Sequence, residues 1–316
     1  MTENRKKEKN FISAVIYTRN NGVAIEKYLP RFYSFFCENF EVFELIIVND
    51  HAQDDTIDRV VKLFGPYKSQ AVSLINMSHY QGVEASIIAG VDYAIGDYVI
   101  EFDTLITDYD LSVIMQAYYK CTEGYDIVTA SPDTSKLSSK LFYAIFNAYS
   151  KINYKLGTER FRILSRRAIN RISSVSTSIT YRKAIYYTSG LTSYLLKYKS
   201  VDKRLSRSIH SAFSERIGLA LKSLLLFTDI IVKMAFYLAL GMFMFSIVVG
   251  IYVLWAKLIY QRIVEGWTTL MLFLAISFSG IFVLIAFLIK YVSLNFDLNN
   301  KNKNYIYSSF RKISGQ

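Results

Sequence analysis

The chain contains little cysteine and little proline. Its 316 residues include 2 cysteines, Cys37 and Cys121, which stand far apart and belong to no Cys-x-x-Cys pair or Cys/His cluster. A disulfide framework and a zinc site are therefore not expected, and a reducing compartment fits the pattern. The 3 prolines exclude collagen-like and proline-rich linker classes. The start of the chain, MTENRKKEKN, is polar and charged, so no secretory signal peptide is expected there.

Acidic residues are scarce between Thr134 and Arg216. This stretch holds 17 Lys and Arg residues against 3 acids, in a chain whose formal net charge is +11. Such a basic block attracts a polyanion, which could be nucleic acid, a phosphorylated ligand or an anionic membrane surface. The alternative is a solvated basic face without a ligand.

Two long runs of the sequence lack any formal charge. Met234–Trp255 has 22 residues and Trp267–Ile289 has 23, and each is long enough to cross the hydrocarbon core of a bilayer. Both runs are apolar all round, which favours membrane helices over two buried helices of a soluble core. They predict a transmembrane hairpin with spans at about 232–255 and 267–290.

Positive charge is concentrated outside this hairpin. The basic block precedes the first span, and the loop between the spans has only Lys257 and Arg262 as basic residues. The basic residues that follow the second span are Lys290, Lys301, Lys303, Arg311 and Lys312. The positive-inside rule therefore places both termini in the cytoplasm and predicts a multi-pass protein of the inner (plasma) membrane.

The segment just before the first span is amphipathic. In residues 211–229, Phe213, Ile217 and Leu221 recur at helical spacing, with Glu215 and Lys222 on the other side. This pattern predicts a helix along the membrane surface. We therefore expect a cytoplasmic domain at 1–210 and a membrane module at 211–316, whose last part, 291–316, is a cytoplasmic tail.

The first domain alternates strand and helix patterns. The runs that predict β-strands are residues 11–18, 43–50, 71–77 and 97–103. Helical patterns follow each of the first three, at residues 22–36, 54–64 and 83–95. This alternation predicts an α/β domain with a mostly parallel sheet that is covered on both faces.

Polar side chains follow three of these strands where they end. Arg19 and Asn20 follow the first strand, Asp50 ends the second and Asp103 ends the fourth. Ligands of such sheets bind at the carboxyl ends of the strands. One polar strand end is ordinary turn chemistry, but several at the same edge predict a binding site.

Four segments together resemble a known family. They are SAVIYTRNN, ELIIVNDHAQDDT, QGVEASIIAGVDYAIGDYVIEFD and ERFRILSRRAIN, in this order. The chain looks like glycosyltransferase family 2 with the Rossmann-like A-type (GT-A) fold, and more narrowly like the polyprenyl-phosphate glycosyltransferases related to dolichyl-phosphate mannose synthase. The surface helix and two spans resemble the membrane module of the bacterial members.

The resemblance implies a hexosyltransferase that takes a nucleotide-sugar donor and a polyprenyl (undecaprenyl) phosphate acceptor for polysaccharide biosynthesis. It assigns Asn20, Asp50 and Asp103 to the nucleotide-sugar, with Asp103 as the first acid of the Asp-x-Asp motif. Asp103 and Arg162 would act in catalysis, near the diphosphate. Arg162, Arg166 and Arg167 would lie near the acceptor phosphate. A divalent metal, Mg²⁺ or Mn²⁺, and a homo-oligomer are also implied.

The sequence departs from the family pattern at the metal motif. The motif here is Asp103-Thr104-Leu105, so the second acid is a leucine, which cannot ligate Mg²⁺ or Mn²⁺. Asp108 is a candidate substitute ligand beside Asp103, and its alternative role is that of a loop acid before a helix. Replacing Leu105 by Asp is expected to restore a carboxylate beside Asp103.

Two functions stay open on this basis. The first is an inverting, membrane-bound glycosyltransferase. In it, Arg162 and other basic residues stabilise the leaving nucleoside diphosphate in place of a metal ion. The other candidates are Arg160, Arg166, Arg167, Arg182 and Lys183. The second is a catalytically impaired relative that binds lipid phosphate or nucleotide-sugar as an accessory protein, which Leu105 favours. No nucleic-acid partner is expected.

Overall fold

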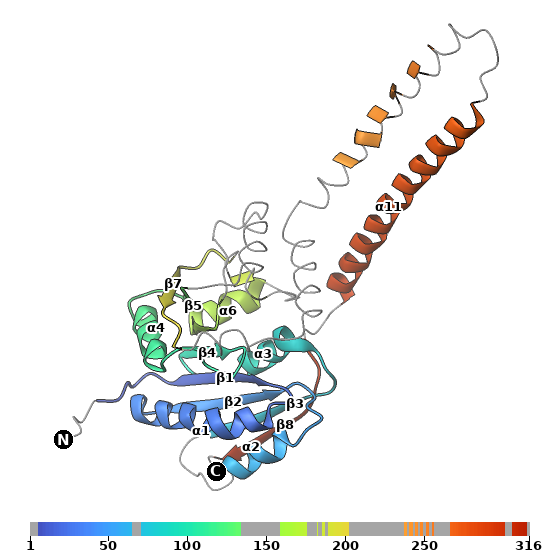
Figure 1. Cartoon of the computed structure of the whole chain (residues 1–316). Helices are drawn as coiled ribbons and strands as arrows, with labels where there is room; N and C mark the ends of the chain where they lie inside the picture. The colour runs from blue at the N-terminus through green and yellow to red at the C-terminus, as the bar shows by residue number, and fades with distance from the viewer. Residues whose placement is uncertain are drawn as a thin grey trace. The chain divides into compact units, whose positions relative to one another are not determined.

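The protein, described by a computed structural model, divides into two units (Figure 1). The first holds Met1–Asn147, Ile152–Leu219 and Lys301–Gln316, and the second holds Ala148–Lys151 and Ala220–Asn300. The structure describes residues 6–64, 71–133, 159–175, 182, 185–186, 189–201, single positions between 237 and 255, 266–300 and 305–314. The predicted surface helix at 211–229 and about half of the first predicted span lie outside these residues.

The first unit is built on one sheet. Its described strands lie in the order β7-β5-β6-β4-β1-β2-β3-β8. They are β1 (Ile12–Thr18), β2 (Phe43–Asn49), β3 (Ala71–Met77), β4 (Tyr98–Phe102), β5 (Ile127–Pro132), β6 (Phe161–Ser165), β7 (Ser193–Tyr198) and β8 (Tyr307–Ser314). Strands β6 and β8 are antiparallel to their neighbours, and the other pairs are parallel. The predicted α/β class with a mostly parallel sheet is confirmed.

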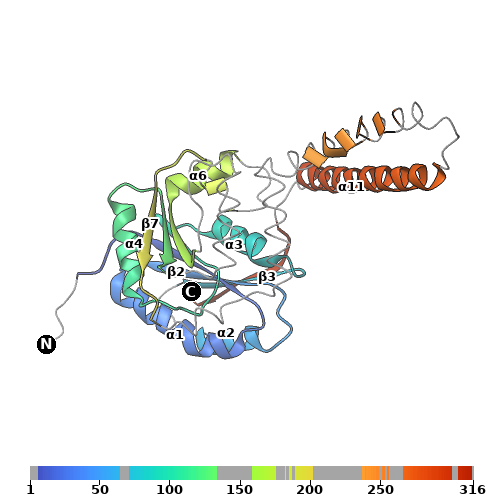
Figure 2. The same ribbon diagram turned by 45° about the horizontal axis from the view of Figure 1, so that its top comes forward.

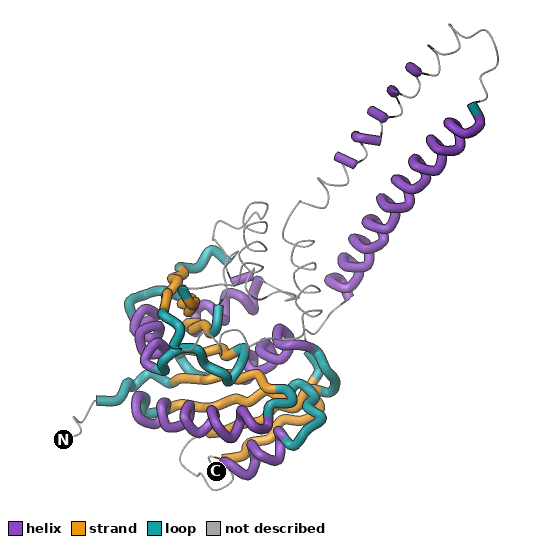
Figure 3. Tube along the Cα trace, viewed as in Figure 1, coloured by secondary structure: helices purple, strands orange, loops and turns teal. Residues whose placement is uncertain are grey.

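Helices cover both faces of this sheet (Figures 2 and 3). One face packs against α1 (Gly22–Asn39), α2 (Thr56–Phe64) and α4 (Ser112–Thr122). The other face packs against α3 (Gly82–Tyr93) and α6 (Arg166–Val175). Alternate residues of a strand point to opposite faces, so Ala14 and Ile16 of β1 join the first core while Val15 joins the second.

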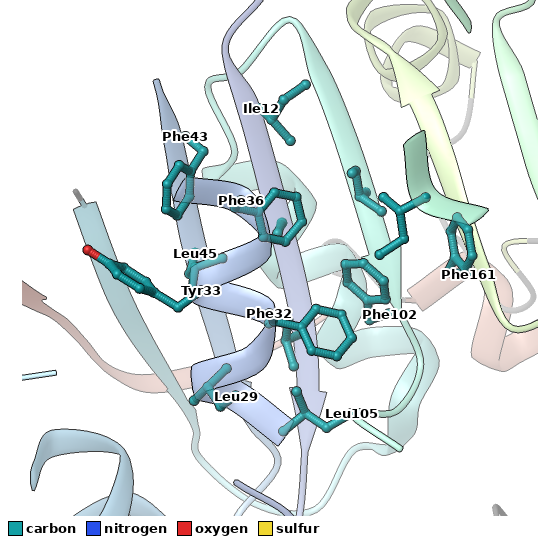
Figure 4. Packing of buried hydrophobic residues seen from close by; sticks show 14 of the residues in the cluster. Ile12, Leu29, Phe32, Tyr33, Phe36, Phe43, Leu45, Phe102, Leu105 and Phe161 are labelled. Carbon is teal, nitrogen blue, oxygen red and sulfur yellow. The ribbon is translucent and has the colours of Figure 1, made fainter. Parts of the chain in front are cut away.

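Aromatic side chains fill the first of these cores. Phe32 of α1 meets Phe102 of β4 edge to face, with ring centroids 4.9 Å apart. Figure 4 shows Leu105 on the same side of the sheet as Leu29 and Phe32. The short segment after β4 therefore returns directly into the apolar core.

Helix α3 lies unusually close to the sheet. A Cβ atom at Gly90 would lie 2.2 Å from Cγ1 of Val15, so a larger side chain at this position would force the helix away from β1. The close packing fixes the position of α3 over the centre of the sheet. Its first turn, which begins at Gly82, is thereby held next to the ends of β1 and β2.

Strand β8 lies in the segment 291–316, for which the sequence predicts only a tail. It pairs antiparallel with β3 and closes that edge of the sheet. Phe310 stacks on Tyr93 of α3 with ring centroids 4.8 Å apart, and Asn76 donates a hydrogen bond to Oγ of Ser309 at 2.9 Å. The last segment of the chain is thus part of the first unit.

The second unit contains the long helix α11 (Trp267–Asn300), which includes the second predicted span. Phe245 stacks on Phe273 with centroids 6.2 Å apart, so the segment around Phe245 lies beside α11. Within the described residues, no helix satisfies both the length and the hydropathy that a membrane crossing requires. The hairpin and its orientation stay predictions.

Removal of β8 tests its contribution to the sheet. A chain that ends at Asn304 loses the pairing with β3 and the ring contact with Tyr93. We expect its free energy of unfolding to fall by about 2 kcal/mol or more, because hydrogen bonds and cross-strand contacts are lost together. Urea denaturation measures the loss, and hydrogen exchange should become faster in Ala71–Met77. A chain that ends at Ser314 is the matched control. Unchanged exchange in β3 after the longer truncation would contradict the assignment.

Candidate active site

The polar residues predicted at the strand ends lie together at the carboxyl ends of the parallel strands. Strand β1 lies between β2 and β4, and Thr18 of β1 is in register with Asn49 of β2. The chain proceeds from β1 to β2 and β3 on one side, whereas β4 pairs with the other side of β1. This is a topological switch point, the place where open α/β sheets bind ligands. The residues that follow β1, β2 and β4 therefore surround a candidate site.

Asp50 holds the beginning of α3. Its Oδ1 accepts a hydrogen bond from the Gln81 amide, and its Oδ2 accepts one from the Gly82 amide, both at 2.9 Å. The hydroxyl of Tyr17 donates to Oδ2 at 3.1 Å, and burial together with Asp50 raises the pKa of this tyrosine. Asp50 is fully buried. Its carboxylate thus shapes the site by fixing α3, and its oxygens are directed to the protein.

The segment before β8 contacts the same turn. Oε1 of Gln81 accepts a hydrogen bond from the Ile306 amide at 2.9 Å, and Nε2 of Gln81 donates to the Ile306 carbonyl. The Ser78 amide donates to that carbonyl at 3.1 Å. The end of the chain therefore helps to fix the turn that Asp50 holds.

Asn20 is one of the residues that line a small pocket. Its φ of 49° is in the left-handed region, which asparagine tolerates better than most residues. Its Oδ1 accepts a hydrogen bond from the Gln53 amide at 2.8 Å. The pocket has a volume of about 350 Å³ and is lined by Asn20, Asn21, Gly22, Val23, Ala24, Lys27, Tyr28, Asp54 and Asp55. Next to Asn20, the guanidinium of Arg19 lies 3.7 Å from the centre of the Tyr80 ring.

Asp103 is held by two arginines. Nη2 of Arg182 donates to Oδ1 of Asp103 at 2.8 Å, and Nη2 of Arg162 lies 3.7 Å from Oδ2. Both arginine side chains are buried, whereas the side chain of Asp103 is 27% exposed. Asp103 is therefore the member of this cluster that is exposed to solvent at the carboxyl ends of the strands.

Glu101 lies beneath Asp103 and binds the same two arginines. Its Oε2 accepts hydrogen bonds from Nη1 of Arg162 at 2.8 Å and from Nη1 of Arg182 at 2.7 Å. Its Oε1 accepts one from the Tyr186 hydroxyl. Burial and the Glu101 charge raise the pKa of Tyr186, so this hydroxyl stays protonated as a donor.

Two further carboxylates complete the cluster. Oε2 of Glu159 accepts from Nε of Arg162 at 3.0 Å, and Oε2 of Glu84 accepts from Nε of Arg182 at 3.0 Å. Burial opposes the charged form of both arginines, but the surrounding carboxylates hold the pKa of each well above its usual value. Arg162, predicted to contact substrate, is thus a buried residue whose guanidinium binds Glu101 and Glu159.

Leu105 does not face the site. It is 3% exposed and belongs to the core beneath α1. The side chain at this position lies among apolar residues, so an aspartate here would have to leave the core to lie beside Asp103. That such an aspartate would be a metal ligand stays a prediction.

Asp108 is also engaged elsewhere. Its Oδ2 lies 3.1 Å from Nη2 of Arg160, and its Oδ1 accepts a hydrogen bond from the Tyr198 hydroxyl at 2.7 Å. Its side chain is fully buried. Among the residues that the structure describes, no three His, Cys, Asp or Glu side chains are grouped so that they could hold a metal ion. The described residues do not fit a divalent metal at Asp103, which binds Arg182 instead.

Arg166 and Arg167 lie at the opposite edge of the sheet. Because β6 is antiparallel to β4, Arg162 pairs with Glu101 near the site, whereas Ser165 pairs with Tyr98 at the far end. Arg166 donates to the carbonyls of Ala94 and Gly96. The structure does not bring this part of the predicted set to Asp103.

The side chain of Arg167 has a structural partner at that edge. Its Nε donates to Oδ1 of Asp126 at 2.7 Å, and this hydrogen bond is the main cause that lowers the Asp126 pKa to about 2. Asp126 also accepts hydrogen bonds from Thr192 and Ser165. The group joins the beginning of β5 to the segment before β7.

Sequence reasoning missed the carboxylates of the cluster. Glu101 interrupts the buried run of β4, and a single acid in such a strand indicates a buried ion pair. Glu84 in the first turn of α3 gave no such signal, because acids are common there. Arg182 was named only as one of several arginines, and its contacts depend on the tertiary fold.

An α/β sheet with this switch-point site is shared by many enzymes, and comparison with known proteins defines the family. Residues 13–186, more than half of the chain, match the family described as Glycosyl transferase family 2. The chain belongs to this family and is a glycosyltransferase.

Several relatives match over most of their length. The uncharacterized glycosyltransferase YkcC of Bacillus subtilis is 24% identical over 93% of this chain and 92% of its own. The prophage bactoprenol glucosyl transferase homolog of Escherichia coli is 22% identical over 91% of this chain and 96% of its own. The bactoprenol glucosyl transferase of Shigella phage SfV is 24% identical over 78% and 82%.

Solved structures resemble the chain at low identity. The mannosyltransferase of Pyrobaculum calidifontis in complex with GDP-Man and Mn²⁺ has a TM-score of 0.44 and 14% identity over 90% of this chain and 88% of its own. Glucosyl-3-phosphoglycerate synthase from Mycobacterium tuberculosis, in complex with Mn²⁺, UDP-glucose and phosphoglyceric acid, has a TM-score of 0.47 and 13% identity over 68% and 78%.

Substitution of Leu105 tests its place in the core. Leu105→Asp puts a carboxylate among apolar side chains, so we expect the free energy of unfolding to fall by about 3 kcal/mol or more. The control Leu105→Met keeps the volume and should cost less than about 1.5 kcal/mol. Urea denaturation measures both. Equal stability of Leu105→Asp and wild type would show that this side chain faces the solvent.

Proposed function

We propose that this glycosyltransferase moves a sugar from a nucleotide-sugar to a polyprenyl phosphate, with inversion at the anomeric carbon. The observation that carries the proposal is Asp103, a partly exposed carboxylate at the switch point that Arg182 and Arg162 hold in place. Membership of glycosyl transferase family 2 supports transfer from an activated donor. Relatives named bactoprenol glucosyl transferases support a polyprenyl phosphate as the acceptor.

The reaction needs little activation of the acceptor. A phosphate monoester has a second pKa of about 6, so it is largely dianionic at neutral pH and needs no general base. One of its oxygens attacks the anomeric carbon of the sugar. A new carbon–oxygen bond forms, the bond to the nucleoside diphosphate breaks, and its electron pair leaves with the diphosphate oxygen.

The candidate site supplies fixed groups around this reaction. Asp103 is placed to accept hydrogen bonds from donor hydroxyl groups. The loop at Asn20, held by Gln53, borders the pocket beside α1 that would take part of the donor. Arg19, whose guanidinium stacks on Tyr80, is a cation at the same sheet edge and would attract the diphosphate. Asp50 fixes the first turn of α3 through its hydrogen bonds to the Gln81 and Gly82 amides.

The acceptor is a membrane lipid, so the proposal includes membrane attachment. The two uncharged runs, Met234–Trp255 and Trp267–Ile289, support a hairpin in the inner membrane with the first unit and both termini in the cytoplasm. Helix α11 presents exposed apolar side chains, among them Leu270, Ile281 and Leu288. The proposal also includes a homo-oligomer, which is implied by the resemblance to the polyprenyl-phosphate glycosyltransferases.

The alternative function is an accessory protein that binds nucleotide-sugar or lipid phosphate without transfer. The observation that favours it is Leu105, which removes the second acid of the motif and lies in the core. Binding without turnover would distinguish it from the enzyme.

A transfer assay decides between the two functions. The purified full chain in detergent is incubated with undecaprenyl phosphate and labelled UDP- and GDP-sugars, with Mn²⁺ or with EDTA. We expect labelled lipid from at least one donor, and Asp103→Asn should reduce the rate by about tenfold or more. The variant Arg171→Lys, on the exposed side of α6, is the control. Nucleotide binding without labelled lipid from any donor would favour the accessory function.

A further inference from the structure

Arg182 connects three carboxylates that come from different parts of the sequence. Its Nε lies 3.0 Å from Glu84 of α3, its Nη1 lies 2.7 Å from Glu101 of β4, and its Nη2 lies 2.8 Å from Asp103. The backbone amide of Arg182 also donates to Glu84, at 2.9 Å. Each nitrogen of the guanidinium thus serves a different acceptor.

The chemistry of the guanidinium makes this connection rigid. The group is planar, stays charged and presents its donors in a fixed fork, so three acceptors on it have fixed relative positions. The side chain of Arg182 is fully buried, which strengthens these contacts relative to water. A lysine has the same charge but cannot address three acceptors along one plane.

Arg162 supports the same arrangement from the other side. Its Nη1 shares Oε2 of Glu101 with Arg182, and its Nη2 lies 3.7 Å from the second oxygen of Asp103. A divalent cation on either oxygen of Asp103 would lie close to a guanidinium and would be repelled. The arrangement therefore opposes metal binding by Asp103.

We propose that Arg182 is a positioning residue for Asp103, and that it orients and charge-balances this carboxylate so that donor binding does not depend on a divalent cation. The inference rests on the proposed function, because it assumes that Asp103 faces the donor. It also explains how a chain with leucine at the second acid of the motif retains an ordered Asp103.

The same geometry predicts what removal of Arg182 creates. Glu84, Glu101 and Asp103 all direct an oxygen to the place of the guanidinium. As they stand, these three carboxylates do not form a metal site. Without the guanidinium they can move toward a shared cation, and oxygen ligands of this kind bind Mn²⁺. Arg182→Ala should therefore bind Mn²⁺ more tightly than wild type, because the guanidinium that repels a cation is gone and the carboxylates can move toward a shared ion.

Nucleotide affinity gives the first test. Calorimetry measures the Kd of the purified full chain for UDP and GDP, in EDTA and with Mn²⁺. We expect the wild-type Kd to agree in the two conditions within about twofold, and Arg182→Lys to weaken binding by about tenfold, since two charge-assisted hydrogen bonds are lost. Arg171→Lys should leave the Kd unchanged. A wild-type Kd that rises by more than about tenfold in EDTA would overturn the proposal.

Direct metal titration gives the second test and needs no nucleotide. Electron paramagnetic resonance follows Mn²⁺ added alone to wild type, Arg182→Ala and Asp103→Asn, after thermal unfolding has shown which variants are folded. We expect saturable Mn²⁺ binding in Arg182→Ala and none at Asp103 in wild type. Saturable binding by wild type that Asp103→Asn abolishes would overturn the proposal, even if Arg182→Ala does not fold.

The two tests separate this inference from the proposed function. If wild type binds neither UDP nor GDP under any condition, the proposed donor site is wrong. Mn²⁺ bound at Asp103 in wild type then also overturns the role of Arg182, whereas Mn²⁺ bound by Arg182→Ala alone supports it.

Discussion

The contact between the Arg182 guanidinium and three carboxylates is the interaction on which the candidate site depends. It joins the first turn of α3, the interior of β4 and the residue that follows β4. Burying several charges together is costly unless each is paired and hydrogen-bonded. Because Arg182 and Arg162 satisfy these carboxylates in a fixed geometry, Asp103 can be exposed at the sheet edge without losing its orientation.

Helix α3 connects the groups that hold the site. Its first turn is fixed by Asp50, which follows β2, by Glu84 through Arg182, and by Gln81 through Ile306. The close contact at Gly90 presses the same helix onto β1. The two strand-end carboxylates are thus parts of one support, in which Asp50 fixes the helix and Asp103 is the partly exposed member.

Much of this arrangement could be predicted from the sequence. Apolar β-branched runs locate β1 to β4, and their polar ends locate Asn20, Asp50 and Asp103, because carboxyl ends of parallel strands share one edge. The sequence could not show that Arg166 and Arg167 lie at the far edge, since that depends on β6 being antiparallel to β4.

Other features depend on contacts between distant segments. Strand β8 has a mixed, partly basic sequence, and its partner β3 lies more than 200 residues earlier, so local pattern gave no signal. Leu105 was interpreted as a lost metal ligand from its place in a motif. The structure places it in the core beside Phe32 and Leu29, where its apolar character has a structural reason (Figure 4).

Manganese anomalous diffraction from crystals grown with UDP and Mn²⁺ tests the central claim most directly. The account predicts Arg182 at hydrogen-bond distance from Asp103, with no manganese peak within coordination distance of either Asp103 oxygen. A manganese peak bound to Asp103, with the Arg182 guanidinium displaced from it, would contradict the account.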